Sequence, residues 1–413
     1  MFTQITRCRI CGNSHLERVL DLGEQALTGV FPRSREQKVG SGPLRLVKCV
    51  GDVKSACGLL QLEHSYALSE MYGENYGYRS GLNASMVAHL NSKVERISRQ
   101  VSLEPGDLVI DIGSNDATTL KAYTQAGLQL AGVDPTGSKF REYYPPHVEL
   151  IPEFFSAELI RARFGAQKAK VVTSFSMFYD LEAPMSFMAE VGEILADDGI
   201  WVFEQSYMPS MLATNSFDTV CHEHLEFYAL RQIQWMAERT GLKIDDVEFN
   251  DVNGGSFSVT VRKSLKEEPQ NGLVTRILHD EAAAGLDGLA PFCAFEDRVE
   301  RARETVSAFV ADARAEGRSV AGLGASTKGN VLLQYCGFTA QDIFAVGEVN
   351  SDKFGSFTPG SLIPILSEQK LLEQSPDYLL VLPWHFRSFF EQSPAFAGRT
   401  LVFPLPEFSI VER

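Results

Sequence analysis

The run Cys221-His-Glu-His224 places two histidines on either side of a glutamate. Histidine titrates near neutrality and is the side chain that most often acts as a general base. A zinc protease needs its two histidines four residues apart on a helix, so the spacing of His222 and His224 excludes that site. In an extended segment these histidines would share one face and Glu223 would point away, whereas in a tight turn all three could converge. The run is a candidate catalytic cluster, and the alternative is a hydrogen-bonded group in the core.

The stretch Asp111-Ile-Gly-Ser-Asn-Asp116 follows a short apolar run and predicts a turn from strand to helix. Gly113 allows the backbone to approach a ligand closely. The next expected strand ends at Asp134, whose carboxylate can accept hydrogen bonds from both ribose hydroxyls. The full G-x-G-x-x-G pattern is absent, which favours a cofactor without a pyrophosphate, and S-adenosylmethionine fits. The alternative is a structural glycine turn of any doubly wound sheet.

We expect Asp111 and the turn to hold the amino-acid part of this cofactor and Asp134 to hold its ribose. Phe154 or Phe155 can pack on the adenine. The residues predicted to bind the cofactor are Asp111, Gly113, Asn115, Asp116, Asp134, Phe154, Phe155 and Ser174.

Four cysteines gather near the N-terminus, at Cys8, Cys11, Cys49 and Cys57. Four thiolates can close a tetrahedral zinc site of the structural kind, which leaves no position open for water. The first pair has knuckle spacing, whereas the second pair is wider than the usual roughly two to four residues. We predict a zinc ion whose role lies in folding. The alternative is ordinary buried thiols or one redox pair.

Strands that alternate with helices predict a parallel, doubly wound sheet in the middle of the chain. The expected strands cover residues 108–112, 128–134, 169–177 and 199–205. The expected helices cover residues 82–99, a stretch from about 117, and residues 185–195. Residues 243–251 and 255–263 then predict a hairpin around Asn253-Gly-Gly255. A parallel sheet finished by an antiparallel hairpin is the layout of class I methyltransferases.

A second, smaller α/β unit is expected after a linker near residues 263–270. It consists of a long amphipathic helix over 292–316 and strands at 319–323, 343–349, 378–382 and 401–404. The first segment predicts short strands and turns around the cysteines. The predicted fold is therefore α/β with three domains: a small zinc-stapled domain over 1–75, a class I, Rossmann-like methyltransferase domain over 76–265, and a smaller Rossmann-like α/β domain over 266–413.

Composition limits the partners of this 413-residue chain. Its net charge of −15 argues against a nucleic-acid binder, which needs a basic face. No stretch approaches the roughly 20 apolar residues that cross a bilayer, and the first residues do not form a signal peptide. Seven cysteines, four of them early, suit a reducing compartment better than a disulfide framework. We expect a cytoplasmic protein without membrane or nucleic-acid partners, as a monomer or weak homo-oligomer.

Nine short motifs occur in order along the chain. They are Cys8-Arg-Ile-Cys11, Leu20-Asp-Leu-Gly23, Cys57-Gly-Leu-Leu-Gln-Leu62, Tyr76-Gly-Tyr-Arg-Ser80, Asp111-Ile-Gly-Ser-Asn-Asp116, Phe203-Glu204, Glu223-His224, Gly254-Gly255 and Gly322-Leu-Gly-Ala-Ser-Thr-Lys328. Together they resemble the C-methyltransferases of deoxysugar biosynthesis, which act at carbon 3 of dTDP- or GDP-linked 4-keto sugars. The resemblance covers nearly the whole chain.

The resemblance implies a C-terminal domain that helps to hold the nucleotide sugar. It implies that His224 is the catalytic base, that Glu223 assists it, and that a tyrosine from the stretch Tyr76 to Tyr78 faces the sugar. His222 completes the candidate catalytic set. The base would remove the hydrogen on carbon 3, and the enolate carbon would attack the sulfonium methyl group. Tyr76, Tyr78 or a nearby polar group would stabilise the enolate oxygen.

Some residues depart from the family pattern. Cys49 lies farther from Cys57 than is usual, which implies a short insertion that loops out. Tyr179-Asp180 stands where some members have a histidine, and Cys221 replaces larger residues, so the sugar or its stereochemistry can differ.

The C-terminal glycine turn, Gly322-x-Gly324, lacks the third glycine of a dinucleotide site, and NAD is not predicted. The turn either offers amides to a diphosphate, with Lys328 adding charge, or is a packing turn. Two other functions are compatible with the sequence: an O- or N-methyltransferase on another small molecule, and a non-catalytic methyltransferase-like scaffold. The intact Asp111–Asp116 turn and the His224 cluster argue against the scaffold.

Overall fold

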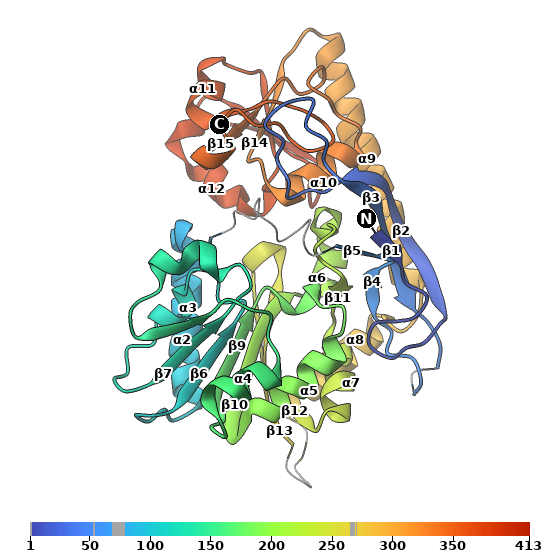
Figure 1. The fold of residues 1–413 in the computed structure, drawn as a ribbon. Helices are drawn as coiled ribbons and strands as arrows, with labels where there is room; N and C mark the ends of the chain where they lie inside the picture. Colours follow the sequence, from blue (N-terminus) through green and yellow to red (C-terminus); the bar gives the residue numbers. More distant parts are fainter. Residues whose placement is uncertain (1, 53, 68–78, 265–268, 270) are drawn as a thin grey trace.

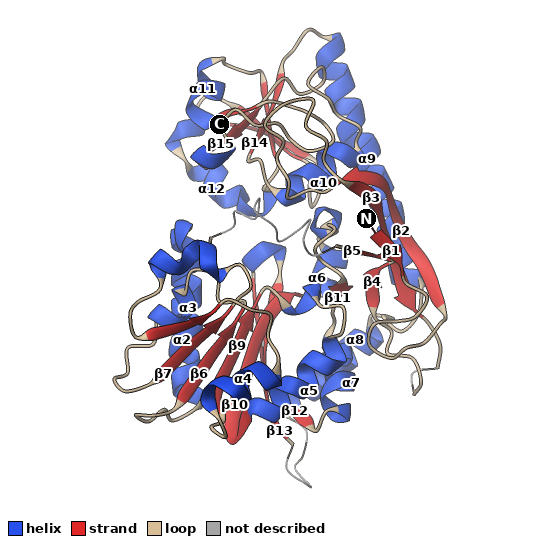
Figure 2. Cartoon of the chain, in the orientation of Figure 1, coloured by secondary structure: helices blue, strands red, loops and turns tan. Residues whose placement is uncertain are grey.

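The computed structural model describes residues 2–52, 54–67, 79–264, 269 and 271–413 (Figure 1). The described residues fold into α/β units, each built on its own sheet, with helices on the faces of the two larger sheets (Figure 2). This confirms the predicted α/β class.

The central sheet has seven strands in the order β12-β13-β10-β9-β6-β7-β8. Five strands run parallel, and the hairpin strand β13 pairs antiparallel with β10. The strands are β6 (Leu108–Ile112), β7 (Gln129–Val133), β8 (Val148–Ile151), β9 (Ala169–Phe175), β10 (Leu195–Ser206), β12 (Leu242–Asn250) and β13 (Ser256–Lys263). The expected hairpin is confirmed, and β8 is an additional strand that the sequence analysis missed.

Both faces of this sheet are covered, because side chains alternate along each strand. Leu108, Ile110 and Ile112 of β6 pack with the helices of one face, while Val109 packs with those of the other. The first face carries α4 (Ala157–Phe164), α5 (Pro184–Ile194) and α7 (Leu230–Arg239). The second face carries α2 (Ala84–Gln100) and α3 (Thr118–Lys121). The strand order reverses between β6 and β9, and ligands of such sheets bind at the carboxyl ends of the strands beside that point.

Short helices connect the carboxyl ends of the central strands. They are η1 (Ser80–Leu82), η2 (Gly137–Tyr143), η3 (Phe178–Asp180), α6 (Met208–Ala213), η4 (Phe217–Thr219) and η5 (Val252–Gly254).

The N-terminal segment forms a four-stranded sheet in the order β11-β4-β3-β2 and a small β1-β5 pair. The strands are β1 (Phe2–Gln4), β2 (Leu16–Ala26), β3 (Ser41–Cys49), β4 (Leu60–Leu62), β5 (His64–Tyr66) and β11 (Glu226–Phe227). Two of them, β2 and β3, are long, unlike the short strands expected from the sequence. Because β11 begins two residues after His224, the N-terminal sheet anchors the end of the candidate catalytic turn.

The C-terminal unit has a six-stranded sheet in the order β16-β15-β14-β17-β18-β19, parallel except for β19. Its strands are β14 (Val320–Leu323), β15 (Val346–Glu348), β16 (Ile365–Ser367), β17 (Tyr378–Val381), β18 (Thr400–Phe403) and β19 (Ser409–Glu412). Its helices are α9 (Ala290–Ala315), α10 (Thr327–Tyr335), η6 (Ser351–Lys353), α11 (Glu368–Glu373), η7 (Trp384–Phe386), α12 (Arg387–Gln392) and η8 (Pro394–Phe396). The sequence pattern predicts this unit, but it does not predict β16 and β19.

The helix α8 (Gly272–Ala283) packs with the central sheet, although the expected boundary at residue 266 places it in the C-terminal unit. Val274 and Ile277 share a core with the central strands, and Glu281 accepts hydrogen bonds from the first backbone amides of α7. Judged by its packing, the C-terminal unit therefore begins at α9. The composition of the linker alone does not predict this boundary.

The long helix α9 joins the C-terminal unit to the N-terminal sheet, because it lies along β2 (Figure 1). Phe292 and Phe295 share one core with Leu20 and Leu46 of that sheet. The Nζ atom of buried Lys48 lies 4.6 Å from the centre of the Phe292 ring. Across the described residues, no helix is both long and apolar enough to span a membrane.

We expect Phe292→Ala to lower the free energy of unfolding by about 3–5 kcal/mol, because it leaves a cavity at a fully buried site. The change also removes the aromatic ring on which the Lys48 ammonium group packs. The measurement is urea denaturation followed by fluorescence. The matched control is Phe389→Ala, since Phe389 is 63% exposed and its loss should change stability by no more than about 0.5 kcal/mol. Equal stability of the two variants would contradict the packing described for α9.

Candidate functional site

The glycine turn after β6 lies at the switch point of the central sheet. Gly113 has a φ of +76°, and its amide donates to the Val133 carbonyl at the end of β7. A Cβ atom at this position would lie 3.1 Å from Cγ of Met177. The glycine therefore keeps the backbone exposed to a ligand at the edge where β6, β7 and β9 end.

Asp134 ties the glycine turn to the end of β7. Its Oδ2 atom accepts a hydrogen bond from the Asn115 amide at 2.8 Å, and its Oδ1 atom accepts from both the amide and hydroxyl of Thr136 at 2.7 Å. Oδ2 accepts one bond and keeps a second lone pair, so the carboxylate can still accept a hydrogen bond from a ribose hydroxyl. The structure thus brings Asp134 and Asn115 together, as the sequence analysis expected for a shared site.

Asn115 and Asp116 hold the chain that leads into α2. Oδ1 of Asn115 accepts from the Ser80 amide and Oδ2 of Asp116 accepts from the Gly81 amide, both at 3.0 Å. These side chains therefore position η1 over the turn.

Two predicted cofactor residues have their polar atoms engaged inside the protein. The buried Asp111 carboxylate accepts from the Thr173 hydroxyl at 2.6 Å, and burial raises the pKa of Asp111 to about 7, against the effect of that bond. The hydroxyl of fully buried Ser174 accepts from Nε1 of Trp201 at 3.0 Å. Ser174 lies on the same face of β9 as Val172, so its hydroxyl faces the core beside Trp201, and its role in binding the cofactor stays a prediction.

Phe154 and Phe155 follow β8, the strand beside β7. The Phe155 ring packs on Phe187 of α5 with centres 5.1 Å apart, whereas the Phe154 ring is 61% exposed. Of the two alternatives for adenine packing, Phe154 is the ring that a ligand can reach.

His224 has a defined hydrogen-bond direction. Its Nδ1 atom lies 2.8 Å from the Thr219 carbonyl oxygen, which can only accept, so Nδ1 carries the hydrogen and Nε2 is an acceptor. The ring edge packs on Tyr179, with centres 4.5 Å apart. Burial lowers the pKa of His224 to about 4, the Thr219 bond opposes this, and the charge of Lys328 adds to it. The imidazole is therefore neutral at pH 7, as a general base must be.

In the described part of the chain, the side chains of His222, Glu223 and His224 do not all point toward one place. His222 is fully buried, its ring meets Tyr66 edge-on at 4.6 Å, and Nε2 lies 3.5 Å from the Gly42 carbonyl oxygen. It therefore faces the N-terminal sheet, and the core alternative describes it better than a catalytic role. Tyr76 and Tyr78 lie outside the described residues.

Glu223 approaches the loop after β2, where a Cβ atom at Gly29 would lie 2.8 Å from its Oε1 atom. Burial raises the pKa of Glu223, so its protonated form is favoured relative to an exposed glutamate. Its Oε2 atom, Oδ1 of Asp218 and Oγ1 of Thr219 are buried without hydrogen-bond partners in the described part of the chain. Buried polar atoms without a partner are uncommon, so these three atoms are candidates for contact with a polar ligand.

A second polar cluster surrounds Glu204 at the carboxyl end of β10. Oε1 lies 2.5 Å from Nε2 of His89, and Oε2 lies 2.8 Å from both Nζ of Lys93 and Nδ2 of Asn250. Burial acts to raise the pKa of Glu204, but the bond from His89 and the charge of Lys93 outweigh it, so the pKa is lowered and the group is ionised. The sequence analysis noted Glu204 in a motif but missed its partners, because they come from α2 and β12.

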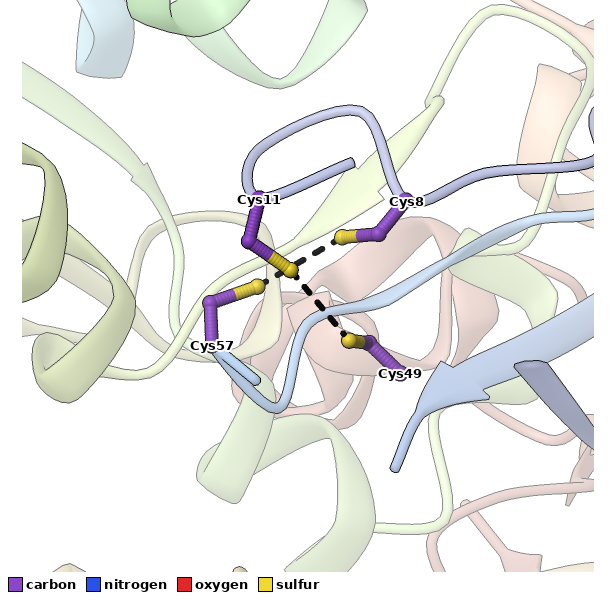
Figure 3. A group of neighbouring side chains, drawn as sticks. All are labelled: Cys8, Cys11, Cys49 and Cys57. Atoms are coloured by element: carbon purple, nitrogen blue, oxygen red, sulfur yellow. Dashed lines mark hydrogen bonds between the residues drawn. The ribbon is translucent and has the colours of Figure 1, made fainter. Parts of the chain in front are cut away.

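The four N-terminal cysteines form one cluster (Figure 3). Their sulfur atoms all lie within 4.8 Å of one another, with 3.5 Å between Cys8 and Cys57 and between Cys11 and Cys49. Tetrahedral zinc with bonds of about 2.3 Å needs sulfur atoms about 3.8 Å apart, so the cluster fits a structural zinc ion. Nδ2 of Asn13 lies 3.4 Å from Sγ of Cys49, as a neighbour that orients a ligand would.

We expect purified protein to carry about one zinc ion per chain, as measured by plasma mass spectrometry. Cys11→Ser should lower the melting temperature and the yield of folded protein, because zinc binding contributes to folding. Cys293→Ser, at an exposed cysteine outside the cluster, is the matched control and should leave both unchanged. Active protein that contains no zinc would contradict this prediction.

Three protein families match successive parts of the chain. Residues 8–72 match the family described as "Putative zinc binding domain", residues 84–247 match "Methyltransferase domain", and residues 251–406 match "C-methyltransferase C-terminal domain". Two solved structures are similar over less than half of the chain. A methyltransferase in complex with the Trm112 activator of Haloferax volcanii is 13% identical with a TM-score of 0.36, covering 44% of this chain and 95% of that chain. The CcbJ methyltransferase of Streptomyces caelestis is 14% identical with a TM-score of 0.34, covering 43% of this chain and 90% of that chain.

A full-length relative is more informative. The C-methyltransferase NovU of Streptomyces niveus is 31% identical over 420 residues, which cover 98% of this chain and 97% of NovU. The matched regions contain the cysteine cluster, the glycine turn and the His224 turn described above. The chain belongs to the family of S-adenosylmethionine-dependent C-methyltransferases that includes NovU.

Proposed function

We propose that this C-methyltransferase acts at carbon 3 of a dTDP- or GDP-linked 4-keto-6-deoxy sugar, with His224 as the base. The observation that carries the proposal is the bond from Nδ1 of the partly buried His224 to the Thr219 carbonyl, which leaves Nε2 without a hydrogen. Transfer of a methyl group to carbon requires a carbanion or enolate, and a neutral imidazole is suited to form one. A non-catalytic scaffold would not need a base at this position.

In this mechanism the 4-keto group acidifies the hydrogen on carbon 3. Nε2 of His224 takes that proton, and the electron pair of the broken C–H bond forms the enolate. S-adenosylmethionine, held at the glycine turn, would supply the methyl group to the enolate carbon, with a C–C bond formed as the C–S bond breaks. The products are the methylated sugar, S-adenosylhomocysteine and a proton held by His224.

Glu223 would donate a hydrogen bond to the enolate oxygen. Burial raises the pKa of Glu223 and so favours the protonated carboxyl, which can donate to developing negative charge. Tyr76 and Tyr78 remain proposed as sugar-facing residues. S-adenosylmethionine would lie at the glycine turn, with its ribose at Asp134 and its adenine at Phe154. The proposal includes a structural zinc ion, a cytoplasmic location and a monomer or weak homo-oligomer. Of the three domains, the first ends near residue 75, and the second includes α8, so that the C-terminal unit begins at α9.

The experiment that tests the substrate is an assay of purified protein with a panel of dTDP- and GDP-linked 4-keto-6-deoxy sugars. Methylation at carbon 3, located by NMR of the product, supports the proposal. Methylation only at oxygen or nitrogen atoms would assign a different acceptor.

We expect Asp134→Ala to weaken the binding of S-adenosylhomocysteine by about 1–3 kcal/mol, because polar groups of the ribose and of the turn lose their acceptor. Isothermal titration calorimetry measures this. Asp198→Ala, whose side chain is 77% exposed at the amino end of the sheet, is the control and should bind as wild type. Unchanged affinity of a folded Asp134→Ala variant would mean that the ribose lies elsewhere.

We expect His224→Asn to lower kcat by about 100- to 10,000-fold, the usual contribution of a positioned base. Binding of S-adenosylhomocysteine should change little, because the imidazole faces the sugar. His279→Asn is the control, since its side chain is 81% exposed on α8. A His224→Asn enzyme within tenfold of wild type would move the base to another group, with Glu223 and His222 the next variants to measure.

A further inference from the structure

The position of the His224 base depends on a short stretch of chain, residues 214–219, which we call the base-support segment. It follows α6 and ends in η4. Its last residue, Thr219, supplies the carbonyl oxygen that accepts from Nδ1 of His224. A shift of this carbonyl would remove the contact that places the hydrogen on Nδ1.

The C-terminal unit holds the base-support segment by a hydrogen bond in a buried place. Nε1 of Trp384, in η7, donates to Oδ2 of Asp218 at 2.8 Å. Asp218 is 1% exposed and Trp384 is 5% exposed, so water cannot readily replace this donor. Because Asp218 directly precedes Thr219, the bond fixes the residue next to the carbonyl that orients His224.

Two further elements of the C-terminal unit contact the same segment. Nδ2 of Asn215 donates to the Arg298 carbonyl of α9 at 3.3 Å. The Phe217 ring meets the Tyr335 ring, at the end of α10, with centres 5.5 Å apart. These contacts set the general place of the segment, whereas the Trp384 bond acts on the residue beside Thr219.

Lys328, also in the C-terminal unit, acts electrostatically on the Asp218 carboxyl group. Lys328 of α10 donates from Nζ to the Asn253 carbonyl at 2.7 Å. Burial raises the pKa of Asp218, and the charge of Lys328 opposes this. Asp218 is therefore a buried acceptor that receives a side-chain hydrogen bond from the neutral indole of Trp384, and the loss of this bond is costly because water cannot readily replace it.

We infer that Trp384 is a positioning residue for catalysis: its bond to Asp218 holds the Thr219 carbonyl where it fixes the tautomer and direction of His224. The inference rests on the proposed role of His224 as the base. It assigns to the C-terminal unit a part in the chemical step, carried by an indole N–H that is distinct from any contact with the sugar nucleotide.

The test compares Trp384→Phe with Trp235→Phe. The first removes the indole N–H while keeping an aromatic ring. The second makes the same change on α7, where Nε1 of Trp235 has no hydrogen-bond partner among the described residues and the ring packs on Arg239. The readouts are kcat, the KM for S-adenosylmethionine, the melting temperature, and the tautomer of His224 by two-dimensional ¹H–¹⁵N NMR of histidine-labelled protein. His224→Asn identifies the signal of His224 and serves as the reference for loss of the base.

We expect Trp384→Phe to lower kcat on the order of 10- to 100-fold, as a small displacement of a catalytic group does. The KM for S-adenosylmethionine should stay within about twofold of Trp235→Phe, and the NMR signal of His224 should show the hydrogen partly on Nε2. Asp218→Leu, which removes the acceptor instead of the donor, should give the same result. It also provides the second test if Trp384→Phe does not fold.

A folded Trp384→Phe enzyme with the kcat of Trp235→Phe would overturn the inference. A loss of kcat with the His224 signal unchanged would overturn it as well, because Trp384 would then act by another route. If His224→Asn itself stays active, the proposed function fails. If His224→Asn is inactive while Trp384→Phe is normal, the inference alone fails.

Discussion

The parallel alignment of the central strands is the constraint on which the site depends. Parallel strands end at the same edge of a sheet, so groups far apart in the chain meet there without any contact in sequence. Gly113 follows β6, Asp134 follows β7, and Glu204 lies near the end of β10. The hairpin strand β13 pairs with β10, and Asn250, at the end of its partner strand β12, donates to Glu204. The glycine turn and the Glu204 cluster are consequences of one topology.

Burial has opposite effects on the two glutamates of this region, and the reason lies in their partners. Glu204 has His89, Lys93 and Asn250 as donors, so its pKa is lowered in spite of burial. Within the part of the chain that the structure describes, Glu223 forms no salt bridge, and burial raises its pKa. The Glu204 carboxylate is therefore held as an anion that ties α2 to the sheet. Glu223 is held closer to its neutral form, because different environments separate the protonation of similar groups.

Local patterns predicted the central fold well and the side-chain directions less well. Apolar runs bounded by glycine or proline placed β6, β7, β9 and the hairpin, because such signals are contained in a few consecutive residues. The strands β16 (ILS) and β19 (SIVE) were missed because polar residues interrupt their short apolar runs, whereas β17 (YLLV) is apolar throughout. The direction of His222 could not be predicted, because it depends on Tyr66 and Gly42 of a sheet formed far away in the sequence. The same holds for His89 and for Trp384, whose partners are 115 and 166 residues distant.

The turn that carries His224 is held from both sides of the molecule. β11, directly after the turn, pairs with β4 of the N-terminal sheet, and Gly29 of that segment lies against Glu223. On the other side, Trp384 and α10 hold η4. A turn without regular secondary structure has little stiffness of its own, so its side chains can be placed only as well as its two anchors allow. The central sheet alone would therefore not fix the direction of the His224 imidazole, the base that we propose. This gives a physical reason for a chain in which a methyltransferase fold is joined to two further units: they supply the rigid supports that this turn lacks.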